Sequence, residues 1–285
     1  MNRRPARAFA LDTARLAVGC LHAELALYPK PGLVSPLDNG SHQDMTAATF
    51  MRSLFALRHY FILICRAGID DAPFSVLKGL GIEAERRMLL ATGGVNTHRG
   101  AIFSLGLLCA ALGRARALGT DGSAPALRAV LLSTWGADLA SHTQAVAVDR
   151  NSHGLRAAAL HAAGGAREEG ALGLPSVFEV GLPALRHTLR AGRDLRHARI
   201  DALFALMAHI SDTNVLHRGG RAGAHTVKRH ARRFLAAGGS AHPDWQAAAL
   251  ASHRLFVLRR LSPGGAADLL AATCLVHAAG ARAVA

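Results

Sequence analysis

Residues 211–220 combine side chains that suit a metal ion with side chains that suit phosphate. The segment reads Ser-Asp-Thr-Asn-Val-Leu-His-Arg-Gly-Gly and follows an apolar stretch over 201–210. Asp212 and the neighbouring hydroxyl and amide groups offer the hard oxygen ligands that Mg²⁺ prefers, and Arg218 can grip a phosphate through two parallel hydrogen bonds. A helix N-cap alone would explain Asp212 but not the His-Arg-Gly-Gly that follows. The pattern therefore favours a metal–triphosphate complex as ligand.

A second polar segment, 92–100, separates two apolar stretches and reads Thr-Gly-Gly-Val-Asn-Thr-His-Arg-Gly. Its glycines can end one helix, and Asn96 or Thr97 can begin the next with unpaired N–H groups that attract an anion. His98 and Arg99 add donors and charge at the same point. A C-cap followed by an N-cap would account for the glycines, but not for this density of polar groups, so we expect a phosphate site here.

The exit from the first apolar stretch, 28–45, is stiffened by two prolines that flank Lys30. Lys30 is one of only three lysines in a chain that otherwise uses arginine, so a compact ammonium group is favoured at this point. Asp44 has two interpretations: it could cap the helix that begins near Met45, or it could face a substrate.

Two further segments carry weaker signals. Residues 164–170, Gly-Gly-Ala-Arg-Glu-Glu-Gly, hold adjacent carboxylates that are as typical of a solvated helix face as of a site. Residues 262–270, Ser-Pro-Gly-Gly-Ala-Ala-Asp-Leu-Leu, read first as a helix start, with Ser at the N-cap and Pro after it, although the N–H groups exposed there could also face a site.

The elements that must position these segments are predicted to be helices. Apolar residues recur every three or four positions over 11–25 and again over 50–64, whereas alternating strand patterns are weak. The apolar runs at 126–133 and 172–182 are short enough to be helix or irregular chain. Glycine, proline and polar residues gather at breaks that include 118–125, 149–154, 191–198 and 211–223. We expect an all-α bundle of about ten to twelve helices in one domain over 1–285, with the first ten or so residues disordered.

The formal net charge of +14 raises the possibility of a nucleic-acid partner. The basic residues are scattered through every segment, however, and aromatic residues make up only 5% of the chain, which leaves little to stack on bases. A phosphate-rich small substrate explains the sign of the charge equally well. We therefore expect no nucleic-acid partner.

Cysteine spacing and hydropathy indicate where in the cell the protein is expected. The four cysteines lie far apart in apolar stretches with no zinc-binding spacing, so we expect reduced core residues in a cytoplasmic protein. The basic N-terminus is followed by an amphipathic stretch rather than a signal peptide. Because every apolar run of eighteen residues is broken by a charge or a histidine, we expect no membrane anchor.

Taken in order, these segments resemble the triphosphoribosyl-dephospho-coenzyme A synthase family, which makes the prosthetic-group precursor of citrate lyase and malonate decarboxylase. The resemblance runs from about residue 14 to 280. It rests on PKPG-LV and NGxHxDM, TGGVNTHRGAIF, GAR-x-E with a nearby G-x-P, DTN-x-LHRGG and SPGG-x-ADLLA. The form of residues 35–42 is more similar to the malonate decarboxylase branch. Where the family tends to show GARGEA and GFP, this chain has GAREEG and GLP, so either Glu168 or Glu169 could face the substrate.

The resemblance implies transfer of the 5-triphosphoribosyl group of ATP to the 2′-hydroxyl of 3′-dephospho-coenzyme A, with adenine leaving. It implies inversion from β to α at the sugar, and hence a single in-line displacement through an oxocarbenium-like transition state. The product would pass to a carrier-protein transferase. The implied general base is Glu169 or Asp44, and the implied ligands of Mg²⁺ are Asp212 and Asp44. The implied substrate- and phosphate-binding residues are Lys30, Asn96, Thr97, His98, Arg99, Asn214, His217, Arg218, Gly219 and Gly220.

Two rival functions stay open at this point. A metal-dependent hydrolase of ADP-ribosyl or other N-glycosyl bonds would use similar Asp and Thr ligands on a helical scaffold, with water replacing the acceptor. A nucleic-acid-binding module is the non-enzymatic rival, and it would show a strongly salt-dependent affinity for duplex DNA. The oligomeric state is also left open.

Overall fold

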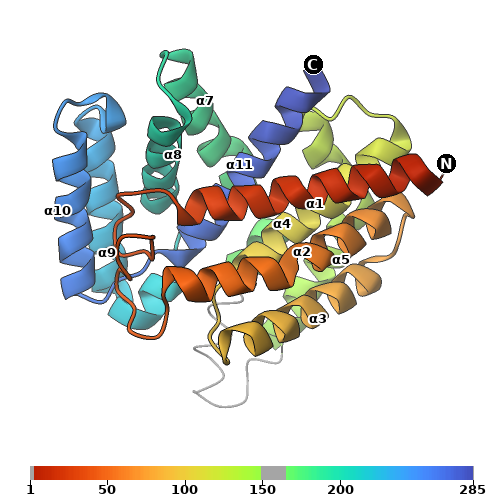
Figure 1. Ribbon diagram of the computed structural model, residues 1–285, viewed down its shortest axis with the longest axis horizontal. Coiled ribbons are helices and arrows are strands. Elements are labelled where there is room, and N and C mark those ends of the chain that lie inside the picture. Colours follow the sequence, from red (N-terminus) through yellow and green to blue (C-terminus); the bar gives the residue numbers. More distant parts are fainter. Residues whose placement is uncertain (1–2, 149–164, 285) are drawn as a thin grey trace.

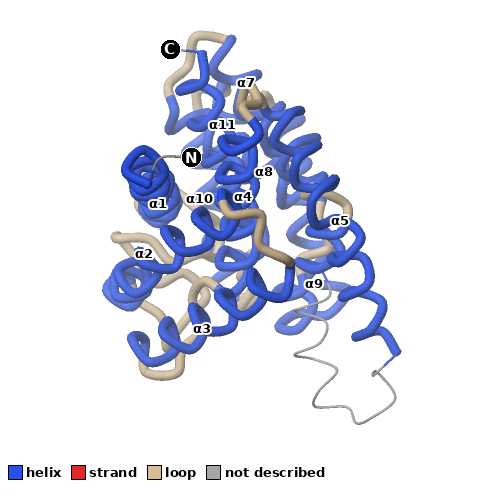
Figure 2. The backbone as a smooth tube through the Cα atoms, turned by 90° about the vertical axis from the view of Figure 1, so that its right-hand side faces the viewer, coloured by secondary structure: helices blue, strands red, loops and turns tan. Residues whose placement is uncertain are grey.

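Helices account for nearly all of the regular structure in the computed structural model, which describes residues 3–148 and 165–284. These residues form 11 α-helices and no strand, as Figures 1 and 2 show, which confirms the all-α prediction. The first five helices are α1 (Arg3–Leu25), α2 (Ala47–Ile69), α3 (Phe74–Thr92), α4 (Arg99–Leu118) and α5 (Ala124–Val148). Residues 165–171 are also helical. After them come a π-helical turn (Ser176–Gly181), α7 (Leu182–Arg190), α8 (Leu195–His209), α9 (Thr213–Ala236), a 3₁₀ turn (Gly239–Ala241), α10 (Trp245–Leu258) and α11 (Gly264–Val284).

Local signals place most of the helix ends. Thr46 caps α2, because its hydroxyl accepts a hydrogen bond from the backbone N–H of Thr49 while the Thr49 hydroxyl accepts from the N–H of Thr46. Gly93 ends α3 in the left-handed region at φ 68°, where glycine carries no steric cost. The start of α2 and the end of α3 therefore lie next to predicted breaks.

Three sequence expectations need correction or refinement. Residues 3–10 are helical and belong to α1, so the expected disorder of the first ten residues was wrong: their apolar positions continue the period of the helix that follows. The break predicted over 211–223 is helical from Thr213 onward, with a kink at Gly220 (φ 56°, ψ −160°). The apolar run 126–133 lies inside α5. The break predicted at 149–154 falls outside the described residues.

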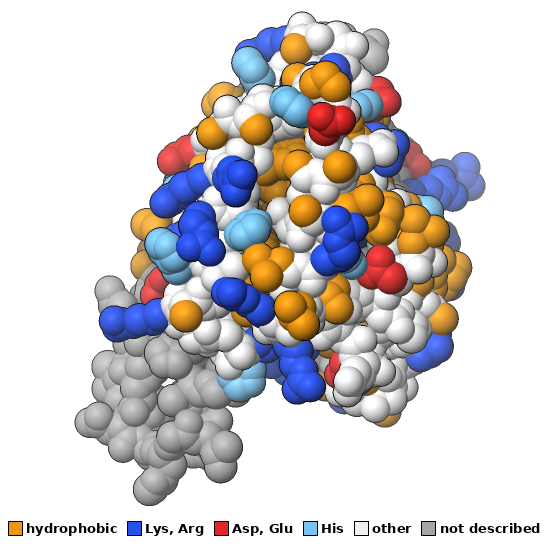
Figure 3. All heavy atoms as spheres, turned by 90° about the vertical axis from the view of Figure 1, so that its left-hand side faces the viewer, with side chains coloured by type: hydrophobic (Ala, Val, Ile, Leu, Met, Phe, Trp, Pro, Cys, Tyr) orange, Lys and Arg blue, Asp and Glu red, His pale blue; other side chains and the backbone are white. Residues whose placement is uncertain are grey.

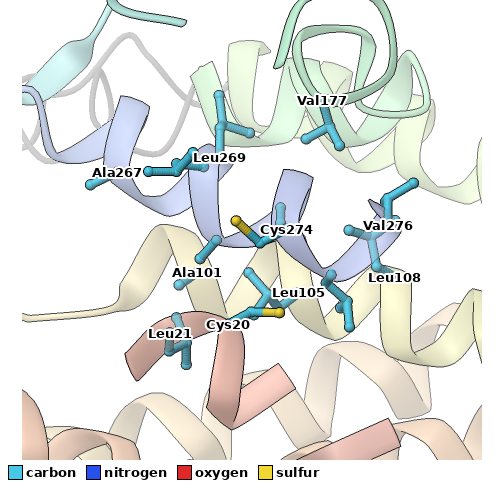
Figure 4. Packing of buried hydrophobic residues seen from close by; sticks show 14 of the residues in the cluster. Cys20, Leu21, Ala101, Leu105, Leu108, Val177, Ala267, Leu269, Cys274 and Val276 are labelled. Atoms are coloured by element: carbon cyan, nitrogen blue, oxygen red, sulfur yellow. The ribbon is translucent and has the colours of Figure 1, made fainter. Parts of the chain in front are cut away.

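Close backbone contact between α2 and α4 builds the centre of the core. A Cβ added at Gly68 would overlap the carbonyl of Ala110, and one added at Gly113 would overlap the carbonyl of Cys65. Only glycine permits this approach. Around it, α1, α4 and α11 pack together, and Figure 4 shows Leu105 of α4 between Cys20 of α1 and Cys274 of α11. The first turns of α4 and α11 are thereby held next to each other.

All four cysteines are buried and none of them forms a disulfide, as the sequence analysis predicted. Burial raises the pKa of the Cys65 thiol to about 12. A thiol in this environment stays protonated and unreactive, and it behaves as a small apolar side chain. The cysteines therefore contribute to packing.

Three helical stretches are long and apolar enough to cross a membrane by length and composition: Ala47–Ile69, Arg99–Leu118 and Gly264–Ala281. The window in α4 is 72% buried inside the protein. Its hydropathy therefore serves the core. The expected lack of a membrane anchor remains a prediction.

Basic side chains are dispersed over the face of the molecule drawn in Figure 3, among hydrophobic and other polar groups. They do not merge into one continuous patch on that face. A duplex-binding surface needs such a patch, because affinity comes from neutralising many neighbouring phosphates at once.

Candidate active site

A cavity of about 800 Å³ lies between the helices, toward the upper end of the usual size of ligand sites. All five polar segments found in the sequence reach its wall, and four of them contribute most of the polar groups. The lining residues from these four segments are Asn96, Thr97, His98, Arg99, Gly100, Gly165, Ala166, Arg167, Glu168, Glu169, Ser211, Asp212, Thr213, Asn214, Arg218, Ser262, Gly264, Gly265, Ala267, Asp268 and Leu269. From the first segment, 28–45, only four side chains take part: Leu33, Val34, His42 and Met45.

Asp212 is buried at the meeting point of two helix N-termini. Its Oδ1 accepts hydrogen bonds from the backbone N–H groups of Asn214 (2.9 Å) and Val215 (3.3 Å), which caps α9. Its Oδ2 accepts from the N–H of Ala266 in the first turn of α11 at 3.1 Å. Burial raises the pKa of Asp212 to about 6, against the opposing effect of these bonds. Asp212 is therefore the N-cap of α9 and also lines the cavity, and its role as a metal ligand stays a prediction.

Two more carboxylates lie near Asp212, and the sequence analysis did not single out either. Glu24 comes from α1 and Asp268 from α11, and both line the cavity. Asp268 packs over the first turn of α4, so closely that a Cβ at Gly100 would overlap its Oδ2. Burial and then the negative charges of Glu24 and Asp212 hold the pKa of Asp268 well above its usual range. These three carboxylates, called the carboxylate cluster below, therefore favour a positive charge beside them.

Lys30 does not line the cavity. Its ammonium group is buried and donates to Glu24 Oε1 at 2.6 Å. Burial lowers the pKa of Lys30, while Glu24 opposes that shift. In this structure Lys30 therefore neutralises one member of the carboxylate cluster from behind the wall, where the sequence suggested a direct contact with phosphate.

The loop that begins α4 is polar but nearly neutral. The Nδ1 atom of His98 lies 2.6 Å from the Ser53 hydroxyl, and burial followed by the charge of Lys30 lowers the pKa of His98 to about 3. Arg99 donates from Nε to Glu85 Oε1 at 2.6 Å, so its charge is compensated. Asn96 and Thr97 also reach the cavity. All four residues lie where the sequence placed them, yet their basic groups add little positive potential.

Glu168 and Glu169 both line the cavity, and they differ in how they are held. Glu169 is half-buried, and its two oxygens accept from the hydroxyl (2.5 Å) and the backbone N–H (3.1 Å) of Ser176. The sequence left open which of the two glutamates faces the substrate. In the structure both line the cavity; Ser176 holds the carboxylate of Glu169 in place, whereas Glu168 is exposed to solvent.

Arg218 and its neighbours complete the wall on the α9 side. Arg218 donates from Nη1 to the carbonyl of Ser41 and lies 3.1 Å from His42 Nδ1 through Nη2. Its charge and burial lower the pKa of His42 to about 4. Asn214 lines the cavity as well.

Besides Lys30, four predicted residues are not among those that line the cavity. Asp44 is exposed, with His42 as its only ion-pair partner among the described residues, at 3.8 Å. Gly219 packs against Leu261, and Gly220 forms the kink in α9. His217 is exposed. The roles predicted for Asp44 as base and metal ligand, and for His217, Gly219 and Gly220 as phosphate ligands, therefore find no support in their placement.

Comparison with known proteins shows what the whole chain is similar to. The family model described as ATP:dephospho-CoA triphosphoribosyl transferase matches residues 10–284. A 2-(5''-triphosphoribosyl)-3'-dephosphocoenzyme-A synthase of Klebsiella pneumoniae is 41% identical over 264 residues, which cover 91% of each chain. A protein of the same name from Pectobacterium atrosepticum is 37% identical over 273 residues, 94% of this chain and 89% of the relative. No solved structure matches the chain.

Proposed function

The chain belongs to the ATP:dephospho-CoA triphosphoribosyl transferase family, and we propose on that basis that it is a triphosphoribosyl-dephospho-coenzyme A synthase. It would transfer the 5-triphosphoribosyl group of ATP to the 2′-hydroxyl of 3′-dephospho-coenzyme A. The bond from C1′ of the ATP ribose to N9 of adenine breaks, and a bond from that C1′ to the acceptor oxygen forms. The supporting observation is a cavity in which a carboxylate cluster lies between groups suited to anions.

The carboxylate cluster suits the charge that develops in this reaction. As the bond to adenine lengthens, the ribose acquires the positive charge of an oxocarbenium ion. Asp268 and Asp212 line the cavity and take part in no ion pair among the described residues, whereas Glu24 is paired with Lys30. Fixed carboxylates in a site from which water is excluded stabilise such a charge more than solvent does. We assign the ribose of ATP to the space beside them.

Glu169 is our candidate for the general base. It lines the same cavity, and Ser176 holds its carboxylate in place with two hydrogen bonds. Removal of the proton from the attacking hydroxyl by a positioned carboxylate commonly contributes about 10²- to 10⁴-fold to the rate. The proton that Glu169 takes balances the one that departing adenine acquires from solvent.

A magnesium ion fits the donors in the cavity. Mg²⁺ is usually held by one or two carboxylates together with substrate phosphates and water. The described residues contain no group of three or more His, Cys, Asp or Glu that could hold a metal alone. Asp212 and Asp268 would hold the ion together with the triphosphate, and its positive charge would screen the phosphates from the carboxylates. We expect Asp212→Asn to fold normally and to need a higher Mg²⁺ concentration for half-maximal rate; an unchanged Mg²⁺ dependence would remove Asp212 from the metal site.

The triphosphate is assigned to the α9 side of the cavity. Arg218 offers a planar donor there, and Asn214 a neutral one. The N–H groups at the starts of α9 and α11 already donate to Asp212, so a bare triphosphate at the same point would meet a carboxylate. A bound cation between the two removes that conflict.

The carrier protein that finally receives the group is a separate proposal. We place this chain in the malonate decarboxylase branch, where the product would pass to a carrier-protein transferase. The support is the sequence Ser-Pro-Leu-Asp-Asn-Gly-Ser-His over 35–42. Modification of the malonate decarboxylase carrier, with no modification of the citrate lyase carrier, would support this choice in a coupled assay.

Analysis of the nucleotide products distinguishes the candidate reactions. Purified protein with ATP, Mg²⁺ and dephospho-coenzyme A should release one adenine for each coupled product, without phosphate or pyrophosphate. Chromatography separates these species. Adenine that appears equally fast without the acceptor would support the N-glycosyl hydrolase, and formation of ADP or AMP would indicate phosphoryl or adenylyl transfer.

A further inference from the structure

One side of the cavity follows a single face of α3. The residues of α3 that line it are Phe74, Leu77, Lys78, Gly81, Ile82 and Glu85, spaced by three and four positions. At a rise of 1.5 Å per residue, the seven steps from Lys78 to Glu85 extend about 10 Å along the helix. Glu85 pairs with Arg99, so the Asn96–Arg99 loop lies at the C-terminal end of this lining face. Lys78 lies toward its N-terminal end, which is called the α3 end of the cavity below.

Basic groups gather at the Lys78 end. The His142 ring of α5 packs against the Phe74 ring with 5.7 Å between centroids, and Lys78 lies one turn beyond Phe74 on the same helix face. Arg167, from helical residues 165–171, lines the same part of the cavity. The charges of Lys78 and Arg167 both lower the pKa of His142, after burial, so the three side chains are close neighbours. Glu168 directly follows Arg167 in the sequence and is exposed.

Apolar side chains lie beside this basic end and are left open to solvent. Ile82 is 61% exposed and Leu172 is 63% exposed, although both are large and hydrophobic and both line the cavity. Phe103 and Leu107 of α4 continue this apolar lining inward. Exposed apolar residues at the mouth of a polar cavity indicate a ligand that is partly apolar.

The α3 end is thus distinct from the α9 side to which the triphosphate was assigned. The proposed reaction has two anionic substrates, and only one of them carries a long, largely uncharged arm. That substrate is dephospho-coenzyme A, in which a pantetheine arm is joined through a diphosphate to the ribose that attacks.

We propose that the α3 end of the cavity is the acceptor subsite, where Lys78 and Arg167 bind the diphosphate of dephospho-coenzyme A and where Ile82 and Leu172 contact its pantetheine arm. This inference rests on the proposed function. It places the two substrates on opposite sides of the carboxylate cluster, with the attacking ribose between the diphosphate at α3 and the ribose of ATP. The chain therefore distinguishes its two nucleotides by the different basic groups that line the two sides of the cavity.

Steady-state kinetics on Lys78→Ala tests the subsite. The Michaelis constant for dephospho-coenzyme A should rise about ten-fold, the size expected for one lost charge-assisted hydrogen bond, while that for ATP changes less than two-fold. Lys78→Arg should restore the acceptor constant. Arg58→Ala removes an exposed basic residue of α2 that does not line the cavity, so both constants should keep their wild-type values. A rise in the constant for ATP, or no change for the acceptor, would overturn the assignment.

Calorimetry separates this inference from the proposed function. Titration of dephospho-coenzyme A into wild-type protein without ATP should show binding, and Lys78→Ala and Ile82→Ser should each weaken it. If wild-type protein binds the acceptor in this way but releases no adenine with it, the proposed reaction is wrong and the subsite stands. If binding is equally tight in the variants and the reaction proceeds, the subsite is wrong and the reaction stands.

Discussion

Lys30 Nζ lies 2.6 Å from Glu24 Oε1, and the two side chains are only 1% and 6% exposed. Taking two charges out of water is costly, and loss of one partner leaves the other buried without compensation. The pair therefore joins the first helix to the loop that follows it only while both members are present.

We expect Lys30→Met to lower the free energy of unfolding by about 3–5 kcal/mol, because Glu24 would remain as a buried, unpaired charge. The double variant Lys30→Met/Glu24→Gln should recover much of that loss. Urea unfolding at neutral pH measures both. Lys228→Met is the matched control: Lys228 donates to the carbonyl of His209 near the surface, and its removal should cost no more than about 0.5 kcal/mol. Equal unfolding midpoints for wild type and Lys30→Met would contradict the argument.

His98 should make the fold sensitive to mild acid. Burial and then the charge of Lys30 lower its pKa from the ordinary 6.5 of a solvated histidine to about 3, so between these pH values the unfolded chain binds more protons than the folded protein does. Stability therefore falls as the pH drops below about 6.5. At pH 5 the loss from this residue is about 2 kcal/mol. The difference in unfolding free energy between pH 7.5 and pH 5 should shrink by that amount in His98→Gln, whatever the variant's absolute stability. An undiminished difference would mean that other groups carry the effect.

Arg218 and Arg99 should differ in their contribution to ATP binding, although the sequence treats them alike. Arg99 is already paired with Glu85, whereas Arg218 contacts a carbonyl and an imidazole. We expect Arg218→Ala to raise the Michaelis constant for ATP about ten-fold or more, since a charge-assisted hydrogen bond contributes roughly 1.5–3 kcal/mol. Arg99→Ala should raise it clearly less. Initial rates of adenine release at saturating acceptor measure both constants, and equal effects would show that the Glu85 pair opens when ATP binds.

The fold was largely predictable because its signals are local. Apolar spacing places the helices, and capping residues such as Thr46 and Gly93 place their ends. The extent of α1 was missed because Arg3, Arg4 and Arg7 suggested a solvated tail, yet charged residues can continue a helix whose other face is apolar.

The site was predictable where polar residues are dense in sequence and not where they meet only through folding. Asp212 lies in such a segment. In the sequence, Glu24 is one charged residue on an amphipathic helix. Asp268 lies in the segment 262–270, which a helix start already explains. The two residues are 244 positions apart, so their contact with one cavity depends on α1 packing beside α11. Lys30 was correctly singled out as unusual, but its partner Glu24 is six residues upstream and gave no signal.

Asp268 offers the sharpest test of the carboxylate cluster, because activity and stability should change in opposite directions. Burial and then the charges of Glu24 and Asp212 hold its pKa well above its usual range, so an ionisable carboxyl at this position lowers the stability of the folded protein at neutral pH. Asp268→Asn removes the ionisable group while keeping an oxygen that can accept from the backbone N–H of Ala101. We therefore expect a higher urea midpoint at pH 7.5 together with loss of most adenine release, a trade typical of residues kept for function.

Gly100→Ala reaches the same carboxylate by a different route. The added methyl group would overlap Asp268 Oδ2, so the carboxylate must move although its charge remains. Activity should fall by about ten-fold or more, because a small misplacement of a catalytic group can cost two orders of magnitude. Gly79→Ala is the control: Gly79 lies in α3 with no neighbour within 4 Å, and alanine there should stabilise the helix by about 0.5–1 kcal/mol without affecting the rate. Should Asp268→Asn and Gly100→Ala both turn over at the wild-type rate, Asp268 has no part in the reaction and the ribose of ATP must bind elsewhere in the cavity.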